Sequence, residues 1–571
     1  MCNEQGVADI FNTYFVKKIE DLKEKIDPNQ KKDPLEKVKL RVRNKNLNFS
    51  LQNVTTETVI KLMKKMAKKK SKGNDGIPQD CLLLGIEVVA DPLTKVVNAS
   101  ISGGIFPEVW KEAIVVPILK KGDPKETKNY RPVSCLPAAS KVMEKVVCDQ
   151  LTRFAEIHDL LPNCQHGFRS QRSTMTALSS MQKEWISNTE DGLTTGILVW
   201  DLSSAFDTLD IELFLKKMEI YGADNQTTNW FKTFLTGRTQ RVRIGGALSA
   251  PLLLESGVPQ GGILSPMIFT IYTADMEMWL KESTLTNFAD DTTTGSKGND
   301  PKIIKANLEE DARNVLSFMA SNGLVANKAK TEFLVLNEKD KTDPTLKDLT
   351  VGDENIIRTT NTKLLGMFIE ESQEWDVHFK KLTTSLNQRL WVIRRIMRRI
   401  PKEKLIGIVH SLWISKLRYG LQLCTKVRIN DSDPKTSKMK ALQVTQNRML
   451  RLLNGTKLKD KINTKSMLEK FGLPSVNQLA AKIKIIEVWK IINKEGYPLS
   501  LDPYNQNLQT RELRPQHNRV FREDCRLQKS KFSFHIDASR LWNATPESIR
   551  TATNLAAAKK ATNTFSRSLP T

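Results

Sequence analysis

Hydrophobic residues recur along the chain with two spacings, and each spacing predicts a different element. Apolar residues three and four positions apart predict helices over residues 10–22, 55–72, 138–154 and 379–400. Apolar runs rich in β-branched residues predict buried strands at residues 113–119 and 196–201. The mixture favours an α+β fold, with helices prevailing in the C-terminal part.

The helix predicted over residues 379–400 has an apolar face and a basic face. Its apolar positions are Phe379, Leu382, Leu386, Leu390, Ile393, Met397 and Ile400. The other positions include Arg389, Arg394, Arg395, Arg398 and Arg399. If the apolar side packs on a core, the arginines can contact the backbone of a nucleic-acid duplex. A basic face that meets only solvent is the alternative.

The length predicts several domains, because 571 residues exceed what one hydrophobic core organises. We expect an N-terminal helix and linker over residues 1–55. A larger domain of mixed structure should follow over residues 56–370. A helical domain over residues 371–455 and a helical C-terminal region over residues 456–571 complete the predicted division.

The charge of the chain points to a polyanionic partner. Its 88 Lys and Arg residues outnumber 64 Asp and Glu residues, which gives a net charge of +24. Nucleic acid is the leading candidate, since the basic residues are spread along the chain instead of gathering on one amphipathic, membrane-binding helix. The lysine-rich run at residues 64–72 is compatible with a solvated face, phosphate contact or a nuclear-import signal.

No segment predicts a membrane span or a secretory signal. Apolar runs stay below the ~20 residues that a bilayer-spanning helix needs, and the first residues lack a basic start followed by an apolar stretch. A soluble, intracellular protein is therefore expected. The seven cysteines are scattered without any C-x-x-C pair, so they are expected to be reduced and not to bind zinc.

The stretch at residues 287–294 places two adjacent acids, Asp290 and Asp291, between an apolar approach and a threonine-rich exit. It predicts a tight β-hairpin with the acids at its tip. Adjacent carboxylates repel unless a cation holds them together, and hard divalent ions prefer carboxylate oxygens. An acidic surface turn is the alternative.

A third acid, Asp201, directly follows the strand predicted at residues 196–201. Ser203 or Ser204 would cap the next helix better than Asp201, which favours a ligand-binding role for the acid. Asp201 and Asp290 lie 89 residues apart. If neighbouring strands bring the three carboxylates together, they can hold two metal ions about 3.5–4 Å apart, as in polymerases.

Arginines in loops between these acids are candidates for phosphate contact. Arg131, Arg169 and Arg172 each lie near a glycine or proline that could hold the guanidinium in place. Residues 230–244 predict a hairpin whose basic face carries Arg238, Arg241 and Arg243. A glycine-rich loop at residues 257–266 then leads into a helix expected to reach about residue 280.

Eight segments in this order resemble the reverse transcriptases of non-LTR (LINE-type) retrotransposons of the Jockey-like branch. They are GNDGIP, NYRPVSCLPAASKVMEK, QHGFRSQRST, VWDLSSAFDTLD, GVPQGGILSP, FADD, NGLVANKAKTEFL and KLLGMFI. The resemblance covers about residues 60–370. It implies a right-hand polymerase fold of fingers, palm and thumb, with an antiparallel palm sheet and a mostly helical thumb and C-terminal region.

The resemblance also implies roles for individual residues. The metal-binding acids would be Asp201, Asp290 and Asp291, holding two Mg²⁺ ions or Mn²⁺ in their place. Residues around the nucleotide would be Arg131, Arg169, Phe206, Gln260 and Gly261, with Phe206 as the aromatic gate against a ribose 2′-hydroxyl. Lys330 would protonate the pyrophosphate, and Lys328 is the competing candidate. Nucleic-acid contacts are expected from Arg238, Arg241, Arg394, Arg395 and Arg398.

Four positions depart from the usual pattern of that family. Ser204 replaces a common lysine, Gly262 a frequent serine and Ser265 a frequent glycine, while Trp200 is a bulky neighbour for Asp201. None of them removes a metal ligand, so they bear on efficiency and not on the type of reaction.

The resemblance implies an RNA-directed DNA polymerase that extends a DNA primer on an RNA template with dNTPs. Members usually carry an upstream endonuclease, which nothing here resembles, so either a truncated copy or an isolated gene model is expected. Its ribonucleoprotein would occupy nucleus and cytoplasm; the sequence does not indicate an oligomeric state. The alternatives are a catalytically inactive nucleic-acid-binding descendant of such an element and a protein like a group II intron maturase.

Overall fold

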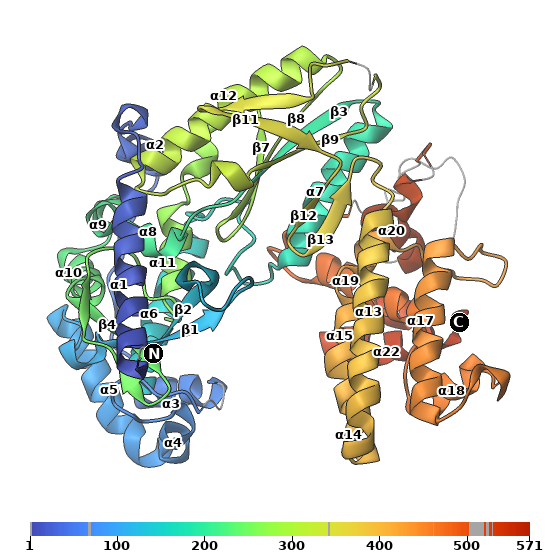
Figure 1. The fold of residues 1–571 in the computed structure, drawn as a ribbon, viewed down its shortest axis with the longest axis horizontal. Coiled ribbons are helices and arrows are strands. Elements are labelled where there is room, and N and C mark those ends of the chain that lie inside the picture. Colours follow the sequence, from blue (N-terminus) through green and yellow to red (C-terminus); the bar gives the residue numbers. More distant parts are fainter. Residues whose placement is uncertain are drawn as a thin grey trace.

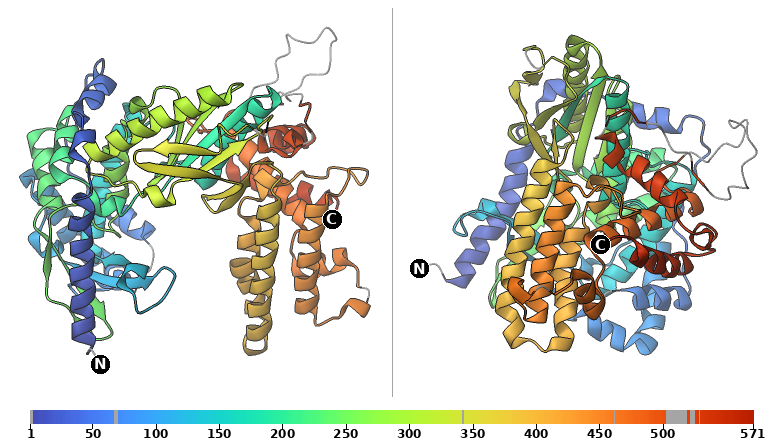
Figure 2. Two further views of the ribbon diagram at one scale, coloured as in Figure 1. Left: turned by 45° about the horizontal axis from the view of Figure 1, so that its top comes forward. Right: turned by 90° about the vertical axis from the view of Figure 1, so that its right-hand side faces the viewer.

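The structure is a computed structural model that describes residues 3–66, 70–340, 343–460, 462–501, 519–520, 525–527 and 529–571. The middle of the lysine-rich run, residues 67–69, lies outside these described residues. Two limbs extend downward from a sheet at the top of the molecule (Figure 1). The same two limbs are separate in the left panel of Figure 2, in which the top of the molecule is turned toward the viewer. No described helix combines the length and apolar character needed to cross a bilayer.

The first limb contains a sheet in the order β2-β1-β4-β5, with β6 paired to β4. Its strands are β1 Ala113–Leu119, β2 Tyr130–Cys135, β4 Arg238–Ile244, β5 Ala247–Leu248 and β6 Leu252–Leu254. Its helices are α1 Glu4–Lys23, α2 Pro34–Val42, α3 Thr56–Lys65, α4 Gln79–Leu84, α5 Ile86–Gly103, α6 Ala138–Ile157, α8 Ala205–Thr208, α9 Ile211–Ile220, α10 Asn225–Leu235 and α11 Ser265–Tyr272. Helix α1 runs along the outside of this limb and packs on β4, β5 and β6 (Figure 1).

A second sheet, in the order β10-β11-β9-β3-β8-β7, joins the limbs. Its strands are β3 Thr194–Trp200, β7 Thr284–Phe288, β8 Asp291–Gly298, β9 Glu332–Leu336, β10 Asp348–Val351 and β11 Glu354–Thr359. All its pairings are antiparallel except the one between β9 and β11. Helix α12 Pro301–Ser321 and helix α7 Thr174–Glu190 both pack on β3.

The two faces of this sheet belong to different cores, because successive residues of a strand point to opposite sides. Leu198, Phe333 and Val335 pack in the core of the first limb with α12. Ile197 and Leu334 pack in the second core, which includes α7 and the helices of the second limb. The sheet therefore ties both limbs into one folded unit.

The second limb is helical beyond a short hairpin of β12 Asn361–Leu364 and β13 Met367–Glu370. Its helices are α13 Asp376–Ile396, α14 Lys402–Val409, α15 Ser415–Arg418, α16 Leu421–Cys424, α17 Ser437–Asn454, α18 Thr464–Phe471, α19 Val476–Asn493, α20 Phe534–Asn543, α21 Glu547–Arg550 and α22 Leu555–Ser568. Helix α13 buries Phe379, Leu382, Leu386 and Ile393, as the spacing of its apolar residues predicts.

The prediction of an α+β fold is confirmed, but three predicted elements differ. Residues 230–244 are not a hairpin: α10 covers the first part, since Trp230, Phe231 and Phe234 share one helical face behind the N-cap Asp224. The helix expected to reach residue 280 ends at Tyr272. Strand β1 is buried only over its first half, since Ile118 is 52% exposed.

Candidate active site

The two adjacent acids lie at the tip of a β-hairpin, as predicted. Phe288 at the end of β7 pairs with Asp291 at the start of β8, which leaves Ala289 and Asp290 as a two-residue turn. Ala289 has a φ of 60°, the left-handed conformation that tight hairpin turns require. The turn therefore places Asp290 and Asp291 together at one end of the sheet.

Strand register brings Asp201 to the same place. Trp200, the last residue of β3, pairs with Thr292 of β8 in antiparallel register. One step further toward this end of the sheet, Asp201 follows Trp200 and Asp291 precedes Thr292, so the two acids lie opposite each other. Paired strands lie about 4.8 Å apart, so these two acids are immediate neighbours across the end of the ladder.

The charge of Asp201 affects the ionisation of both hairpin acids. The pKa of Asp291 rises to about 6, first because its carboxyl group loses part of its hydration and then because Asp290 and Asp201 are negatively charged. Burial also raises the pKa of Asp290, and the charge of Asp201 adds to that effect. Arg131 and Lys120 oppose the rise at Asp290, so both cations face this cluster.

The donor set fits a hard divalent cation, although no ligand cage is formed in advance. In the described parts of the chain, no three acidic, histidine or cysteine side chains are drawn together tightly enough to enclose an ion. Asp201, Asp290 and Asp291 offer the oxygen ligands that Mg²⁺ and Mn²⁺ prefer, and they would hold the metal.

Lys330 and Lys328 have different surroundings. Residues 202 and 326 form a bridge beside Asp201, and the backbone N–H of Asn327 donates to the Asp201 carbonyl at 2.8 Å. This pairing places Lys330 Nζ 3.2 Å from Asp201 Oδ2. Lys328 Nζ instead lies 3.4 Å from the exposed carboxylate of Asp353. The geometry thus places Lys330, and not Lys328, beside a candidate metal ligand.

Phe206 is held in a stack of aromatic rings. The centroid of its ring lies 4.8 Å from that of the stacked Phe269 ring and 6.3 Å from that of the edge-on Phe168 ring. The backbone carbonyl of Phe206 accepts a 2.8 Å hydrogen bond from the Val258 N–H. Phe206 follows Asp201 by five residues, and its ring is held by these aromatic contacts.

The glycine-rich loop lies against both Phe206's helix and strand β2. Gln260 Nε2 donates to Asp207 Oδ2 at 2.8 Å, and the Ser134 N–H donates to the Gln260 carbonyl at 2.8 Å. Gly261 has a φ of 134°, and a Cβ there would overlap the Ser134 oxygen. Glycine is therefore required at this close approach.

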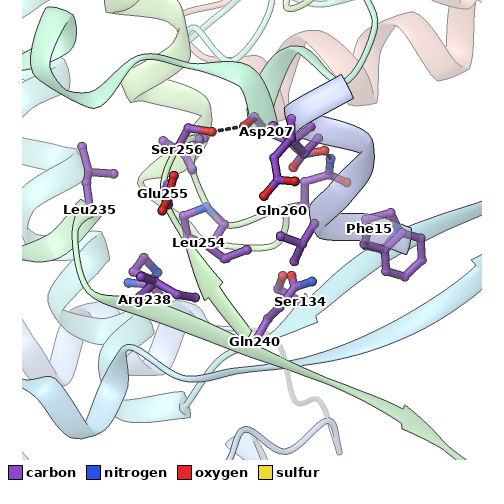
Figure 3. Close-up of a pocket in the computed structure, with 18 of the residues that line it drawn as sticks. Phe15, Ser134, Asp207, Leu235, Arg238, Gln240, Leu254, Glu255, Ser256 and Gln260 are labelled. Carbon is purple, nitrogen blue, oxygen red and sulfur yellow. Dashed lines mark hydrogen bonds between the residues drawn. The ribbon is translucent and has the colours of Figure 1, made fainter. Parts of the chain in front are cut away.

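A cavity of about 150 Å³ lies on the α1 side of this loop (Figure 3). Gln260, Asp207 and Ser134 line one side, and Phe15 of α1 lies on another. Burial raises the pKa of Asp207 to about 6, and the Gln260 amide, Lys18 and Arg131 act against that rise. Polar groups from three separate segments thus converge at this cavity.

The predicted phosphate-binding arginines divide into two groups. Arg131 is exposed on β2, and its charge acts on both Asp290 and Asp207. The assignment of Arg169 needs correction: its side chain is only 7% exposed. Its guanidinium donates to Glu156 at 3.0 and 2.6 Å and to the Pro162 carbonyl at 2.7 Å. Arg169 therefore braces its own loop, and its donors are already used.

Among the predicted nucleic-acid contacts, Arg238 is wrong. It is 3% exposed, donates to the Phe234 carbonyl at 3.0 Å, and burial lowers its pKa to about 10. Arg241 is half-buried and donates to the Ser249 carbonyl at 2.8 Å. Exposed arginines on and just after α13 remain available for such contacts: Arg394, Arg395 and Arg398.

Gln165 is a positioning residue to which the sequence patterns assigned no role. It is 1% exposed, and its Oε1 accepts from the Gly167 N–H at 2.7 Å and the Ala289 N–H at 3.1 Å. The His166 N–H donates to the Asn287 carbonyl at 2.7 Å, so this loop adds to the edge of β7. Gln165 thereby holds the turn that carries Asp290.

The raised pKa of Asp291 predicts that this acid lowers the thermal stability of the metal-free protein at neutral pH. A carboxyl group whose pKa is raised by folding destabilises the fold as pH rises through the window between about 4 and about 6. Asp291→Asn should therefore raise Tm at pH 7.5 by roughly 1–4 °C after allowance for solvent screening. The gain should disappear at pH 4.

Thermal unfolding in EDTA at both pH values measures this effect. Asp353→Asn is the matched control, because Asp353 is an exposed aspartate outside the cluster. A Tm for Asp291→Asn that equals the wild-type value at pH 7.5 would show that folding does not raise the pKa of Asp291.

Comparison with known proteins agrees with this geometry. Residues 118–369 match the family model described as reverse transcriptase (RNA-dependent DNA polymerase). The chain is 25% identical to the probable RNA-directed DNA polymerase from transposon BS of Drosophila melanogaster over 71% of this chain and 45% of that protein. It is 25% identical to the corresponding X-element protein over 64% of this chain and 40% of that protein.

A third relative is the RNA-directed DNA polymerase from mobile element jockey of Drosophila melanogaster. It is 24% identical over 66% of this chain and 42% of its own length. The chain thus spans less than half the length of these relatives. Residues 118–369 are a reverse transcriptase domain, and the chain is related to the RNA-directed DNA polymerases of non-LTR retrotransposons of the Jockey branch.

Proposed function

We propose that the chain is an RNA-directed DNA polymerase that extends a DNA primer on an RNA template with dNTPs. The observation that carries this proposal is the register of β3 with β8, which sets Asp201 opposite Asp291 beside the Asp290 turn. In a domain of the reverse transcriptase family, acids clustered at the ends of paired strands serve nucleotidyl transfer. The proposal therefore rests on geometry and family together.

We assign the right-hand layout as follows. The six-stranded sheet with α7 and α12 is the palm, because it carries the acids. The β1–β2 side of the first limb forms the fingers, with Arg131 on β2 facing the acids. Helix α13 and the helices packed on it form the thumb, followed by the helical C-terminal region.

The residues at the site divide the work of the reaction. Arg131 binds the triphosphate, and Phe206 fills the space that a ribose 2′-hydroxyl would occupy. Lys330 Nζ, 3.2 Å from Asp201 Oδ2, donates a proton to the departing pyrophosphate. Two divalent cations on the three carboxylates would supply activation of the primer 3′-hydroxyl and neutralise phosphate charge.

A basic hollow between the β12–β13 hairpin and helices α13 and α15 supports duplex binding. It encloses about 500 Å³ and is lined by the cations Lys363, Lys381, Arg389 and Lys416. The pKa of Lys416 is lowered by burial and by the charges of Arg389 and Lys363, so these cations face one another. No acid is among its lining residues, which suits a phosphate-bearing strand.

Primer extension on poly(rA)/oligo(dT) with dTTP and Mg²⁺ tests the proposed activity. The wild-type chain should lengthen the primer, and EDTA should abolish the reaction. If the purified, folded chain binds the duplex but adds no nucleotide with Mg²⁺ or Mn²⁺, it is a nucleic-acid-binding protein and not a polymerase.

Binding to the duplex should weaken steeply with salt because contacts to several phosphates release counterions. Replacing Arg394, Arg395 and Arg398 together with glutamine should reduce the slope of log K against log salt by roughly 2–3. Fluorescence anisotropy between 50 and 300 mM KCl measures the slope. A Lys559→Gln/Lys560→Gln variant on α22 serves as the control, since both lysines are exposed; equal slopes for the two variants would remove α13 from the binding surface.

A further inference from the structure

The N-terminal helix α1 carries Lys18 on the face that packs against the first limb. Phe11 and Phe15 are buried in a small core with Val115 and Val242. Lys18 follows Phe15 by three positions and Phe11 by seven, so the helical period puts all three on one face. A lysine at such a position costs stability unless its ammonium group has a partner.

That partner lies beside the candidate active site. Lys18 Nζ donates to Ser204 Oγ at 2.8 Å. Ser204 follows Asp201 by three residues and begins α8 with a φ of 51°. Burial lowers the pKa of Lys18, the charge of Asp207 opposes that effect, and the positive charges of Lys120 and Lys330 add to it. The charges that act on Lys18 thus come from residues that precede Asp201 in the chain and from residues that follow it.

The helix is anchored firmly enough to aim this side chain. Asn12 is 1% exposed, and its Nδ2 donates to the Ala250 carbonyl at 2.8 Å. Gln240 Nε2 donates to Asn12 Oδ1 at 2.9 Å, and Asp9 accepts the Ala250 N–H at 2.9 Å. The ring of Phe11 meets that of Tyr130 edge-on at 4.9 Å. Residues from two strands and a loop thus fix α1 on the first limb.

We propose that Lys18 binds the triphosphate of the incoming nucleotide, so that the N-terminal helix completes the nucleotide site. This inference deepens the proposed function and rests on it. The positive charges of Lys120 and Lys330 act on Lys18, and those of Lys120 and Arg131 act on Asp290. Lys18 contacts Ser204 and Lys330 contacts Asp201, so cations from distant segments meet beside residues 201–204. A polyanion placed there would be attracted by these cations. A triphosphate has both the charge and the length to contact several of them.

Equilibrium binding of inorganic tripolyphosphate tests the inference without any turnover. Lys18→Met keeps most of the aliphatic stem and should weaken binding roughly tenfold, the effect of one charge-assisted hydrogen bond. Lys18→Arg should retain most of the affinity. Lys17→Met on the exposed side of the same helix is the matched control and should bind as the wild type does. Equal affinity of Lys18→Met and wild type, or no binding by wild type, overturns the inference.

Steady-state kinetics then separates a role at the nucleotide from a merely structural one. In Lys18→Met, KM for dTTP should rise roughly tenfold, while KM for poly(rA)/oligo(dT) and Tm stay near wild type. A rise confined to the KM of the duplex would assign Lys18 to the template or primer instead. Failure of the wild type to extend primers would reject the proposed function, whereas normal dTTP kinetics in Lys18→Met would reject only the role of Lys18.

Discussion

Asp290→Asn is expected to lower the rate of primer extension on poly(rA)/oligo(dT) by about 10³-fold or more while leaving duplex binding intact. The change removes one negative charge from a cluster in which Asp290 and Asp201 act on Asp291. Asparagine keeps the size of the side chain, so the two-residue turn between β7 and β8 should persist. The loss therefore reports on ligand charge and not on unfolding.

The control for this loss is Asp353→Asn, whose carboxylate contacts Lys328 at 3.4 Å, outside the cluster. It should extend primers at the wild-type rate. Asp201→Asn should lose activity to a similar degree as Asp290→Asn, because both acids serve the same site. Full activity in Asp290→Asn would mean that the hairpin acids take no part in the chemistry.

Phe206→Val is expected to admit ribonucleotides, with the preference for dGTP over GTP on poly(rC)/oligo(dG) falling by roughly 10–100-fold. The stacked Phe269 ring beneath Phe206 and the hydrogen bond from Val258 fix the ring in place. A shorter side chain opens the space that this ring fills without removing a polar partner. The ratio of kcat/KM for dGTP and GTP measures the change.

Phe206→Tyr, which keeps the ring, should retain the wild-type preference. Thermal unfolding of both variants checks that the aromatic stack still folds. An unchanged dGTP preference in a folded Phe206→Val protein would move the gate to another residue, with Phe168, whose ring meets Phe206 edge-on, the next to examine.

The acid hairpin could be predicted from sequence because its signals are local. Apolar residues before the acids, threonines after them and glycine beyond are enough to predict a turn flanked by strands. The approach of Asp201 is not local: it depends on Trp200 pairing with Thr292, a register set by residues 92 positions apart. From the sequence, the approach of Asp201 to the hairpin acids was only a hypothesis, and the register of β3 with β8 supports it.

The arginines show where sequence reasoning stops. Residue type and loop context favour Arg169 and Arg238, but Arg169 donates to Glu156 and Pro162. Arg238 is buried and donates to the Phe234 carbonyl. Which arginine is free depends on acceptors such as Glu156, which come from another part of the fold. Residues 230–244 were predicted to form a basic hairpin, although the spacing of Trp230, Phe231 and Phe234 satisfies a helix.

Lys18 was missed for a related reason. The apolar residues of α1 predicted a helix but not the surface on which it packs. The sequence therefore did not predict a role for a lysine on the inner face. The signal is the exception itself, since a basic residue at an apolar position needs a partner. Gln165 is similar, because its acceptor role depends on the Ala289 N–H, which is distant in sequence.

The most direct test of the central claim is a crystal structure of the protein soaked with Mn²⁺, with anomalous scattering used to locate the ions. The account predicts Mn²⁺ in contact with the carboxylate of Asp201 and at least one carboxylate of the Asp290–Asp291 pair, with oxygen distances of about 2.1–2.3 Å. Ions that bind Asp290 or Asp291 while the carboxylate of Asp201 turns away, or no ordered ion at saturating Mn²⁺, would contradict it.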